Sequence, residues 1–185
     1  ISHHNELFTN KNSIIENCNI KDIIDSSINM VINISNDLLE EPIIQLNIDD
    51  KLIIPYIPSH IFYIITEILK NSVISLHRNN RLNIPIIIDI SEGYKDIIIK
   101  ISDKGNGFSR EKIDDVFTYS YSTLPINNIY DCNRPIISGL GFGLPTARLY
   151  TRYFGGDLII NPMENYGTDV YIYINKLGNN VETLY

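Results

Sequence analysis

The chain has 185 residues, 44% of them hydrophobic, and a formal net charge of −7 from 15 Lys and Arg against 22 Asp and Glu. This length fits one domain with at most a short appendage, and the composition excludes collagen, a disulfide-stapled miniprotein and a wholly disordered chain. An acidic surface repels phosphate backbones, which argues against a general nucleic-acid binder.

Other whole-chain features narrow the class further. Cys18 and Cys132 are the only cysteines, and they have neither the number of a disulfide framework nor the spacing of zinc ligands. No apolar run approaches the roughly 20 residues of a membrane span. The chain begins at Ile1 without a targeting pattern, so we expect a piece of a longer protein. Residues 1–12 are polar and indicate a frayed helix end or a linker.

The first half of the chain predicts two helices and a hairpin. Apolar residues at helical spacing predict a helix over 20–40. Residues 43–48 and 52–56 are strand-like and flank Asp49-Asp50, which predicts an antiparallel hairpin. A second helix is expected over 58–77, and because most of its faces are apolar it should be buried.

The second half predicts two more hairpins around a long loop. The β-branched runs 84–91 and 96–102 form the first of these hairpins. Residues 103–138 show little periodicity apart from a short helix over 109–117, and such a stretch in a compact domain indicates a functional loop. The remaining elements are a helix over 144–154 and strands over 157–161 and 169–175. The order predicts an α+β, two-layer sandwich: a mixed, mostly antiparallel sheet with helices on one face.

Three polar residues interrupt the apolar second helix. Glu67, Lys70 and Asn71 stand at i, i+3 and i+4, so they share one face. Polar groups on a buried helix are costly unless they are paired or functional. The alternative is a Glu67–Lys70 pair that satisfies itself at the helix surface.

A short glycine motif follows the strand that ends at Ser102. Asp103 at a strand end can accept a hydrogen bond from the exocyclic amine of a base, while Gly105 and Gly107 let the backbone turn tightly beside a ligand. The alternative is an ordinary tight turn.

Two further glycine motifs lie near the C-terminus. Gly139, Gly141 and Gly143 alternate ahead of the third helix, where exposed N–H groups and the helix dipole can cradle phosphate. The alternative is a flexible hinge. Gly167-Thr168 alone would be a turn.

The order and spacing of these four motifs decide between the alternatives. They resemble the nucleotide-binding boxes of the GHKL ATPase superfamily. Longer strings resemble one branch, the mitochondrial pyruvate and branched-chain 2-oxoacid dehydrogenase kinases. These strings are YIPSHIFYIITEILKN at 56–71, YSYSTLP at 119–125, GLGFGLPTARLYTRYFGGDL at 139–158 and GTDVYIYI at 167–174.

The resemblance implies an ATP-dependent protein serine kinase domain. Asn71 would ligate Mg²⁺, Glu67 would orient or deprotonate the attacking serine, and Lys70 would add positive charge near the phosphates. Asp103 would accept from the adenine amino group, with Thr168 on the same base.

The resemblance also implies a nucleotide lid at about 108–140. Gly105 and Gly107 would make room for the nucleotide. The phosphates would be wrapped by Ser122, Thr123, Gly139, Leu140, Gly141, Phe142, Gly143 and Leu144. A second cation, K⁺, would also be compatible with this family.

For the whole protein, the resemblance implies that residues 14–178 form the kinase domain, 179–185 a tail, and 1–13 the remnant of an N-terminal helical regulatory domain. That domain would bind the lipoyl-bearing E2 core. The substrate would be the E1α subunit of a 2-oxoacid dehydrogenase, inactivated by phosphorylation. The resemblance further implies a homodimer through the C-terminal sheet and location in the mitochondrial matrix.

Two positions depart from the pattern of this branch. Pyruvate-type members carry His where Tyr63 stands and Arg where Ile74 stands. This chain therefore lacks two groups that would tune Glu67 and add positive charge near the phosphates, and the sequence does not decide how fast it transfers phosphate. The alternatives are therefore an ATP-binding regulatory module with little transfer, and a histidine-kinase-type ATPase domain.

Overall fold

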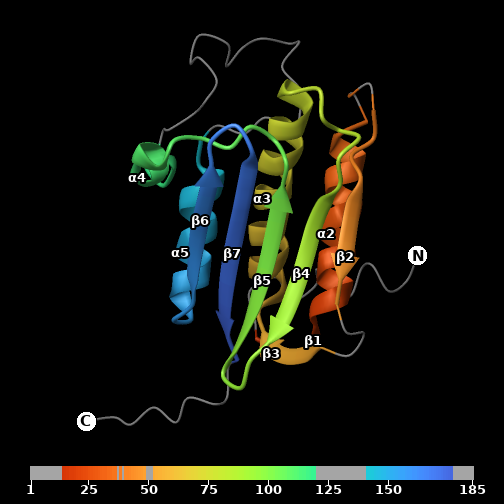
Figure 1. Ribbon diagram of the computed structural model, residues 1–185. Helices are drawn as coiled ribbons and strands as arrows, with labels where there is room; N and C mark the ends of the chain where they lie inside the picture. The colour runs from red at the N-terminus through yellow and green to blue at the C-terminus, as the bar shows by residue number, and fades with distance from the viewer. Residues whose placement is uncertain (1–13, 37, 39, 49–51, 120–140, 177–185) are drawn as a thin grey trace.

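The computed structural model describes residues 14–36, 38, 40–48, 52–119 and 141–176. Its elements are β1 (Ile15–Asn19), α2 (Ile20–Ile34), β2 (Ile44–Asn47), β3 (Ile53–Tyr56), α3 (Pro58–Arg78), β4 (Ile86–Glu92), β5 (Asp96–Asp103), η1 (Arg110–Lys112), α4 (Ile113–Val116), α5 (Gly143–Tyr153), β6 (Asp157–Met163) and β7 (Gly167–Asn175). They form two layers, a sheet and a set of helices (Figure 1), which confirms the predicted fold class.

The main sheet has the strand order β2-β4-β5-β7-β6. β5 pairs antiparallel with β4 and with β7, and β7 pairs antiparallel with β6. β2 pairs with β4 in parallel. Alternate side chains of β5, namely Ile97, Ile99 and Ile101, are fully buried, as the two-residue period of a strand with one covered face requires. The β4–β5 and β6–β7 hairpins were predicted correctly.

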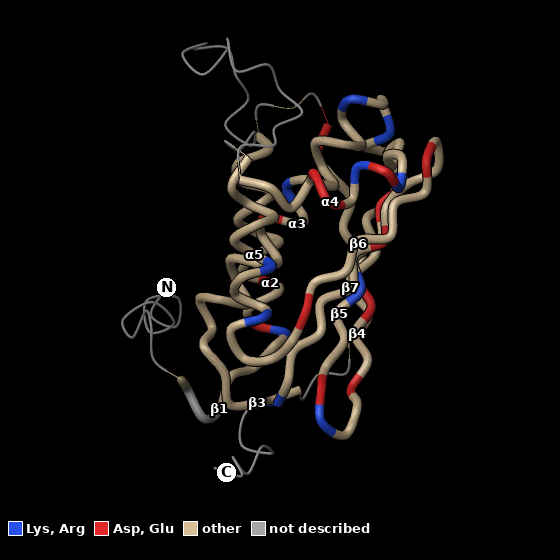
Figure 2. The backbone as a smooth tube through the Cα atoms, turned by 90° about the vertical axis from the view of Figure 1, so that its left-hand side faces the viewer, with Lys and Arg blue, Asp and Glu red and all other residues tan. Residues whose placement is uncertain are grey.

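Three helices, α2, α3 and α5, lie on the same face of the sheet (Figure 2). α3 is central, because it packs against α2 on one side and α5 on the other. Its apolar side chains therefore pack against α2, α5 and the sheet, and Ile64, Ile65 and Leu69 are completely buried. Polar groups of α3, such as Lys70, are confined to the sides of the helix that the apolar packing leaves open.

The predicted hairpin of residues 43–48 with 52–56 is wrong. β2 joins the edge of the main sheet in parallel with β4, and β3 pairs antiparallel with β1. β1 itself was missed. A parallel pair needs a long crossover, and the chain between β2 and β4 supplies one that includes α3. The turn residues at 49–50 did not indicate that β2 pairs with β4, because the pairing of a strand depends on partners distant in sequence.

Helix boundaries also shift. The helix predicted over 20–40 ends at Ile34, where the Ser35 N–H bonds to the carbonyls of the last turn. The predicted helix 144–154 runs from Gly143 to Tyr153, and the short helix at 109–117 is η1 followed by α4. Among the described residues, no helix is both long and apolar enough to cross a membrane. Residues 1–13 and the tail 179–185 lie outside the described residues.

Candidate functional site

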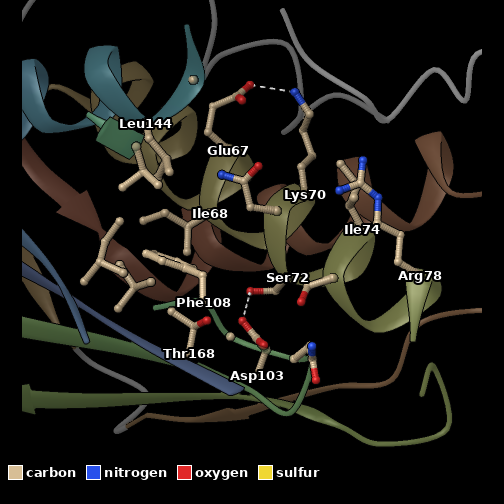
Figure 3. Close-up of a pocket in the computed structure, with 18 of the residues that line it drawn as sticks. Glu67, Ile68, Lys70, Ser72, Ile74, Arg78, Asp103, Phe108, Leu144 and Thr168 are labelled. Atoms are coloured by element: carbon tan, nitrogen blue, oxygen red, sulfur yellow. Dashed lines mark hydrogen bonds and ion pairs between the residues drawn. The ribbon is translucent and has the colours of Figure 1, made fainter. Parts of the chain in front are cut away.

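A pocket of about 370 Å³ opens between α3, the C-terminal end of β5 and the N-terminus of α5. This volume suits a small-molecule ligand. Glu67 and Lys70 lie at one end of the pocket, and Asp103, Ser72 and Thr168 lie toward the other (Figure 3). Most of the predicted site residues thus line one cavity, although they come from segments far apart in the sequence.

The polar face of α3 forms one wall. Lys70 Nζ donates to Glu67 Oε1 at 2.8 Å, and both side chains are 16% exposed. Asn71 lies beside this pair and also lines the pocket. The self-satisfied pair considered as the alternative does exist, yet it lies at the cavity and not on the outer surface. A carboxylate, an ammonium group and an amide therefore reach the same cavity from adjacent turns.

Asp103 is the buried carboxylate of the site and is only 4% exposed. Ser72 Oγ donates to its Oδ2 at 3.1 Å, and the Gly105 N–H donates to its Oδ1 at 2.9 Å. Burial raises the pKa of Asp103 to about 6, although these hydrogen bonds oppose the shift. Thr168 is its register partner on β7, so the two side chains line the same end of the pocket.

Two glycines make room where the chain passes closely. A Cβ at Gly105 would lie 2.8 Å from Ser75 Cβ on α3 and 3.0 Å from Asp103 Oδ1. Gly107 has φ of +56°, a left-handed conformation that side chains disfavour. The Asp-x-Gly-x-Gly segment is therefore a turn, as the alternative held, and its Asp103 and Gly107 also line the pocket, whereas Gly105 does not.

The start of α5 forms the third wall. Gly141, Gly143 and Leu144 line the pocket, and their contact with phosphate stays a prediction. The Glu67 carboxylate packs against Gly143 so closely that a Cβ there would overlap Oε2 and lie 3.1 Å from Cδ. Phe142 does not line the pocket. It is 48% exposed, and its ring faces Tyr119 at a centroid distance of 6.3 Å.

Four predicted phosphate-contacting residues lie outside the described residues: Ser122, Thr123, Gly139 and Leu140. Their predicted roles, and the lid at about 108–140, stay predictions. At the edge of this segment, Arg148 of α5 lies over the Phe117 ring at 4.1 Å. Phe117, in the described first part of the predicted lid, is thereby in contact with α5.

Several pocket residues were not predicted. Ser72 follows Asn71 and faces Asp103, and Arg78 and Lys112 add two cations to the lining. Arg78 lies beside Ile74 on α3 (Figure 3). The i, i+4 spacing of Ile74 and Arg78 is the signal that would have placed Arg78 on the pocket side.

Tyr63, one turn before Glu67, lies among aromatic side chains. Its ring meets Tyr150 edge-on at 5.3 Å. Burial and the neighbouring Glu67 charge raise its pKa, opposed by a hydrogen bond with Thr146 of α5. Tyr63 therefore stays neutral and ties α3 to α5 beside the carboxylate.

The described part of the pocket offers few ligands for a bound cation. Among the described residues, no three His, Cys, Asp or Glu side chains gather as a ready-made metal site. Asn71 offers one amide oxygen at the cavity. Mg²⁺ is commonly held by one or two protein oxygens together with phosphates and water, so a single amide ligand fits a metal that arrives with a nucleotide.

Comparison with known proteins defines the class. Residues 56–177 match the family of histidine kinase-, DNA gyrase B- and HSP90-like ATPases. This match covers more than half of the chain and every described wall of the pocket, and the chain belongs to this family. Family membership implies the use of ATP.

Individual proteins similar to this chain include mitochondrial kinases. The chain is 42% identical over 158 residues to a mitochondrial [pyruvate dehydrogenase (acetyl-transferring)] kinase of Schizosaccharomyces pombe, covering 80% of this chain and 37% of the relative. It is 40% identical over 146 residues to the Arabidopsis thaliana kinase of that name, covering 74% and 40%. Isozyme 1 of Homo sapiens is 39% identical over 126 residues, covering 66% and 29%. The chain thus spans well under half the length of these relatives.

Proposed function

We propose that this chain is the ATP-binding catalytic domain of a protein serine kinase that phosphorylates the E1α subunit of a 2-oxoacid dehydrogenase. One observation carries the proposal. A single cavity joins the Glu67–Lys70–Asn71 face of α3 to the buried Asp103 and to the start of α5. The names of the relatives support pyruvate dehydrogenase as the target complex.

In this proposal the nucleotide spans the pocket. The adenine amino group donates to Asp103, whose carboxylate is already oriented by the Ser72 hydroxyl and by the N–H groups of Gly105 and Thr168. The phosphates lie toward Lys70 and the N–H groups at the start of α5, where the helix dipole favours negative charge. Asn71 would hold Mg²⁺, which neutralises the phosphate charge. K⁺ remains a further candidate cation.

Glu67 would act on the substrate serine. Its carboxylate is at the phosphate end of the pocket, against Gly143. The serine Oγ attacks the γ-phosphorus while its proton passes to Glu67, the bond to the β–γ bridging oxygen breaks, and ADP leaves. Because phosphoryl transfer depends mainly on positioning and charge stabilisation, the Lys70 contact at 2.8 Å orients this base as well as supplying charge.

The test is phosphate transfer from ATP to purified E1α by the full-length protein. Glu67→Gln should lower kcat by about 10²- to 10⁴-fold, the usual contribution of a general base, while ATP affinity changes little. Acid-stable phosphoserine should be the product. Absence of transfer by the wild type, or transfer undiminished by Glu67→Gln, would refute the kinase proposal.

A second candidate, an ATP-binding regulatory module, is favoured by two residues. Tyr63 is a neutral neighbour of Glu67, and Ile74 adds an apolar side chain to the pocket. Tight binding of ATP·Mg without any E1α phosphorylation would support this candidate over the first.

The resemblance to these kinases also suggests how the full-length protein assembles with itself and with an E2 core. Among the described residues, the sheet face away from the helices is uncovered (Figure 2). It carries the neighbouring residues Ile98, Tyr173, Tyr171 and Ile159 across β5, β7 and β6, with Ile159 46% exposed. We propose a homodimer through this face, binding of a lipoyl-bearing E2 core through regions outside this chain, and action in the mitochondrial matrix. Sedimentation of the full-length protein with and without Ile159→Lys tests the dimer.

A further inference from the structure

Arg81 leaves the end of α3 in a fixed direction. The Arg81 N–H bonds to Leu76 O at 2.9 Å, the Asn80 N–H bonds to His77 O at 3.1 Å, and Asn80 has φ of +52°. This combination is the Schellman arrangement, in which a left-handed residue ends a helix and caps its last carbonyls. The half-buried Arg81 side chain is thereby directed from the helix end toward the turn that follows β5.

Arg81 binds that turn through its backbone. Its Nη1 donates to Lys104 O at 3.1 Å and to Gly105 O at 2.7 Å. Lys104 O and the Gly105 N–H belong to one peptide plane, and that N–H donates to Asp103 Oδ1 at 2.9 Å. Arg81 and Asp103 therefore hold the two ends of the same planar group. If the Arg81 bond is lost, the plane is free to rotate and the donor to Asp103 is weakened.

The groups that face Asp103 show why this donor matters. Asp103 receives hydrogen bonds from the Ser72 hydroxyl on α3 and from the Gly105 and Thr168 N–H groups, while the nearby Asp169 carboxylate opposes its ionisation. Because burial already raises its pKa to about 6, a weaker donor would raise the pKa further. The carboxylate would then be less often ionised, and also worse oriented, near neutral pH.

We propose that Arg81 is a positioning residue for nucleobase recognition, which holds the Lys104–Gly105 peptide plane so that Asp103 accepts from the adenine amino group. The inference rests on the proposed function of Asp103 in nucleotide binding. Neither the sequence motifs nor the resemblance pointed to Arg81. The mechanism acts through a backbone group and requires no contact between Arg81 and the nucleotide.

The first arm of the test needs no nucleotide. The pH titration of the Asp103 carboxyl carbon is followed by NMR in the folded full-length protein, as wild type and as Arg81→Met, Arg81→Lys and Lys104→Met. Arg81→Met should raise the midpoint by at least about half a pH unit, since a neighbouring hydrogen bond commonly shifts a pKa by this order. Arg81→Lys, which keeps the charge and a donor, should fall between Arg81→Met and wild type.

Lys104→Met is the charge-matched control. Lys104 is on the same turn, but its ammonium lies over the Tyr166 ring at 3.8 Å, away from the Arg81 contacts. Its removal deletes the same charge and leaves the peptide plane held, so the midpoint should stay near that of the wild type. An unmoved midpoint in Arg81→Met, or an equal shift in Lys104→Met, would overturn the proposal.

The second arm measures binding of ATP and GTP by calorimetry. Arg81→Met should weaken ATP binding by about tenfold, or about 1.4 kcal/mol, and lower the preference for ATP over GTP. The KM for ATP should rise while kcat stays within about twofold. If the wild type binds neither nucleotide, the proposed function fails, whereas the Asp103 titration still decides the role of Arg81. Wild-type affinity and preference in Arg81→Met would overturn that role.

Discussion

The contact between Glu67 and Gly143 offers a direct test of the catalytic carboxylate. In Gly143→Ala the new methyl would overlap Glu67 Oε2 and lie 3.1 Å from Cδ. Carbon atoms pack favourably at about 3.5–4.0 Å, and the overlap with Oε2 is closer than that with Cδ, so the carboxylate must move by roughly 1 Å. The moving atoms end a flexible side chain, and alanine suits a helix better than glycine. We therefore expect no loss of stability.

The expected loss is catalytic. A displacement of about 1 Å at a reacting group can cost about 10²-fold in rate. Single-turnover transfer of phosphate to E1α by the full-length Gly143→Ala protein should fall by about this factor, while the thermal midpoint stays at or above that of the wild type. Calorimetric titration with ATP·Mg separates a binding defect from a slower chemical step.

A double-mutant cycle makes the reasoning refutable. Glu67→Asp shortens the side chain by one methylene, which removes most of the overlap with the new methyl. Gly143→Ala should then lower the transfer rate much less in the Glu67→Asp background than in wild type, because the effects of neighbouring residues are coupled. Equal costs in the two backgrounds, or a full transfer rate in Gly143→Ala alone, would show that Gly143 does not position Glu67.

Three further predictions concern the same pocket. Because burial gives Asp103 a pKa of about 6 against 3.8 ordinarily, the native state holds its proton more tightly. Its contribution to the free energy of unfolding therefore falls as pH rises from 3.8 to 6. ATP affinity should instead rise with pH, because the ionised carboxylate is the acceptor for adenine: it should be about tenfold weaker at pH 5 than at pH 7. Calorimetry should find this pH dependence reduced in Asp103→Asn. Gly107→Ala should destabilise the fold by about 2–4 kcal/mol, measured by denaturant unfolding, since φ is +56° and the new Cβ would lie 2.5 Å from Gly167 O and 2.8 Å from Met163 C. A wild-type midpoint would contradict this. Arg78→Gln should weaken ATP·Mg binding about three- to fivefold and leave adenosine binding unchanged, whereas equal losses would refute a phosphate-side role.

Local spacing predicted the part of the site that lies on one element. Glu67, Lys70 and Asn71 share a helical face because of the i, i+3, i+4 rule, and they do line one cavity. Asp103 was recognised from its position at a strand end, and its burial follows from that end lying under α3. In each case the chemistry of the residue and the period of its own element singled out the position, while the order of the four motifs was needed to favour nucleotide binding over a bland alternative.

Features that depend on distant partners could not be predicted in this way. The strand at 43–48 was joined to its neighbour in sequence, but its partner β4 begins only after α3. Likewise, Arg81 was not singled out from the sequence, because its partners Lys104 and Gly105 are distant along the chain. Pairings of this kind depend on how layers pack, and a single sequence carries little signal of them.

The charge of the chain shows how local the electrostatics of such a site must be. A net charge of −7 would seem to oppose any polyanion, yet charges beyond about 8 Å are largely screened at physiological ionic strength. Among the described residues, the ionisable groups that line the pocket are Lys70, Arg78 and Lys112 against Glu67 and Asp103. Glu67 is paired with Lys70, and Asp103 lies toward the opposite end of the cavity (Figure 3). The phosphate end is therefore less negative than the chain as a whole, so an acidic surface can repel nucleic acid while the pocket admits a single nucleotide with its cation.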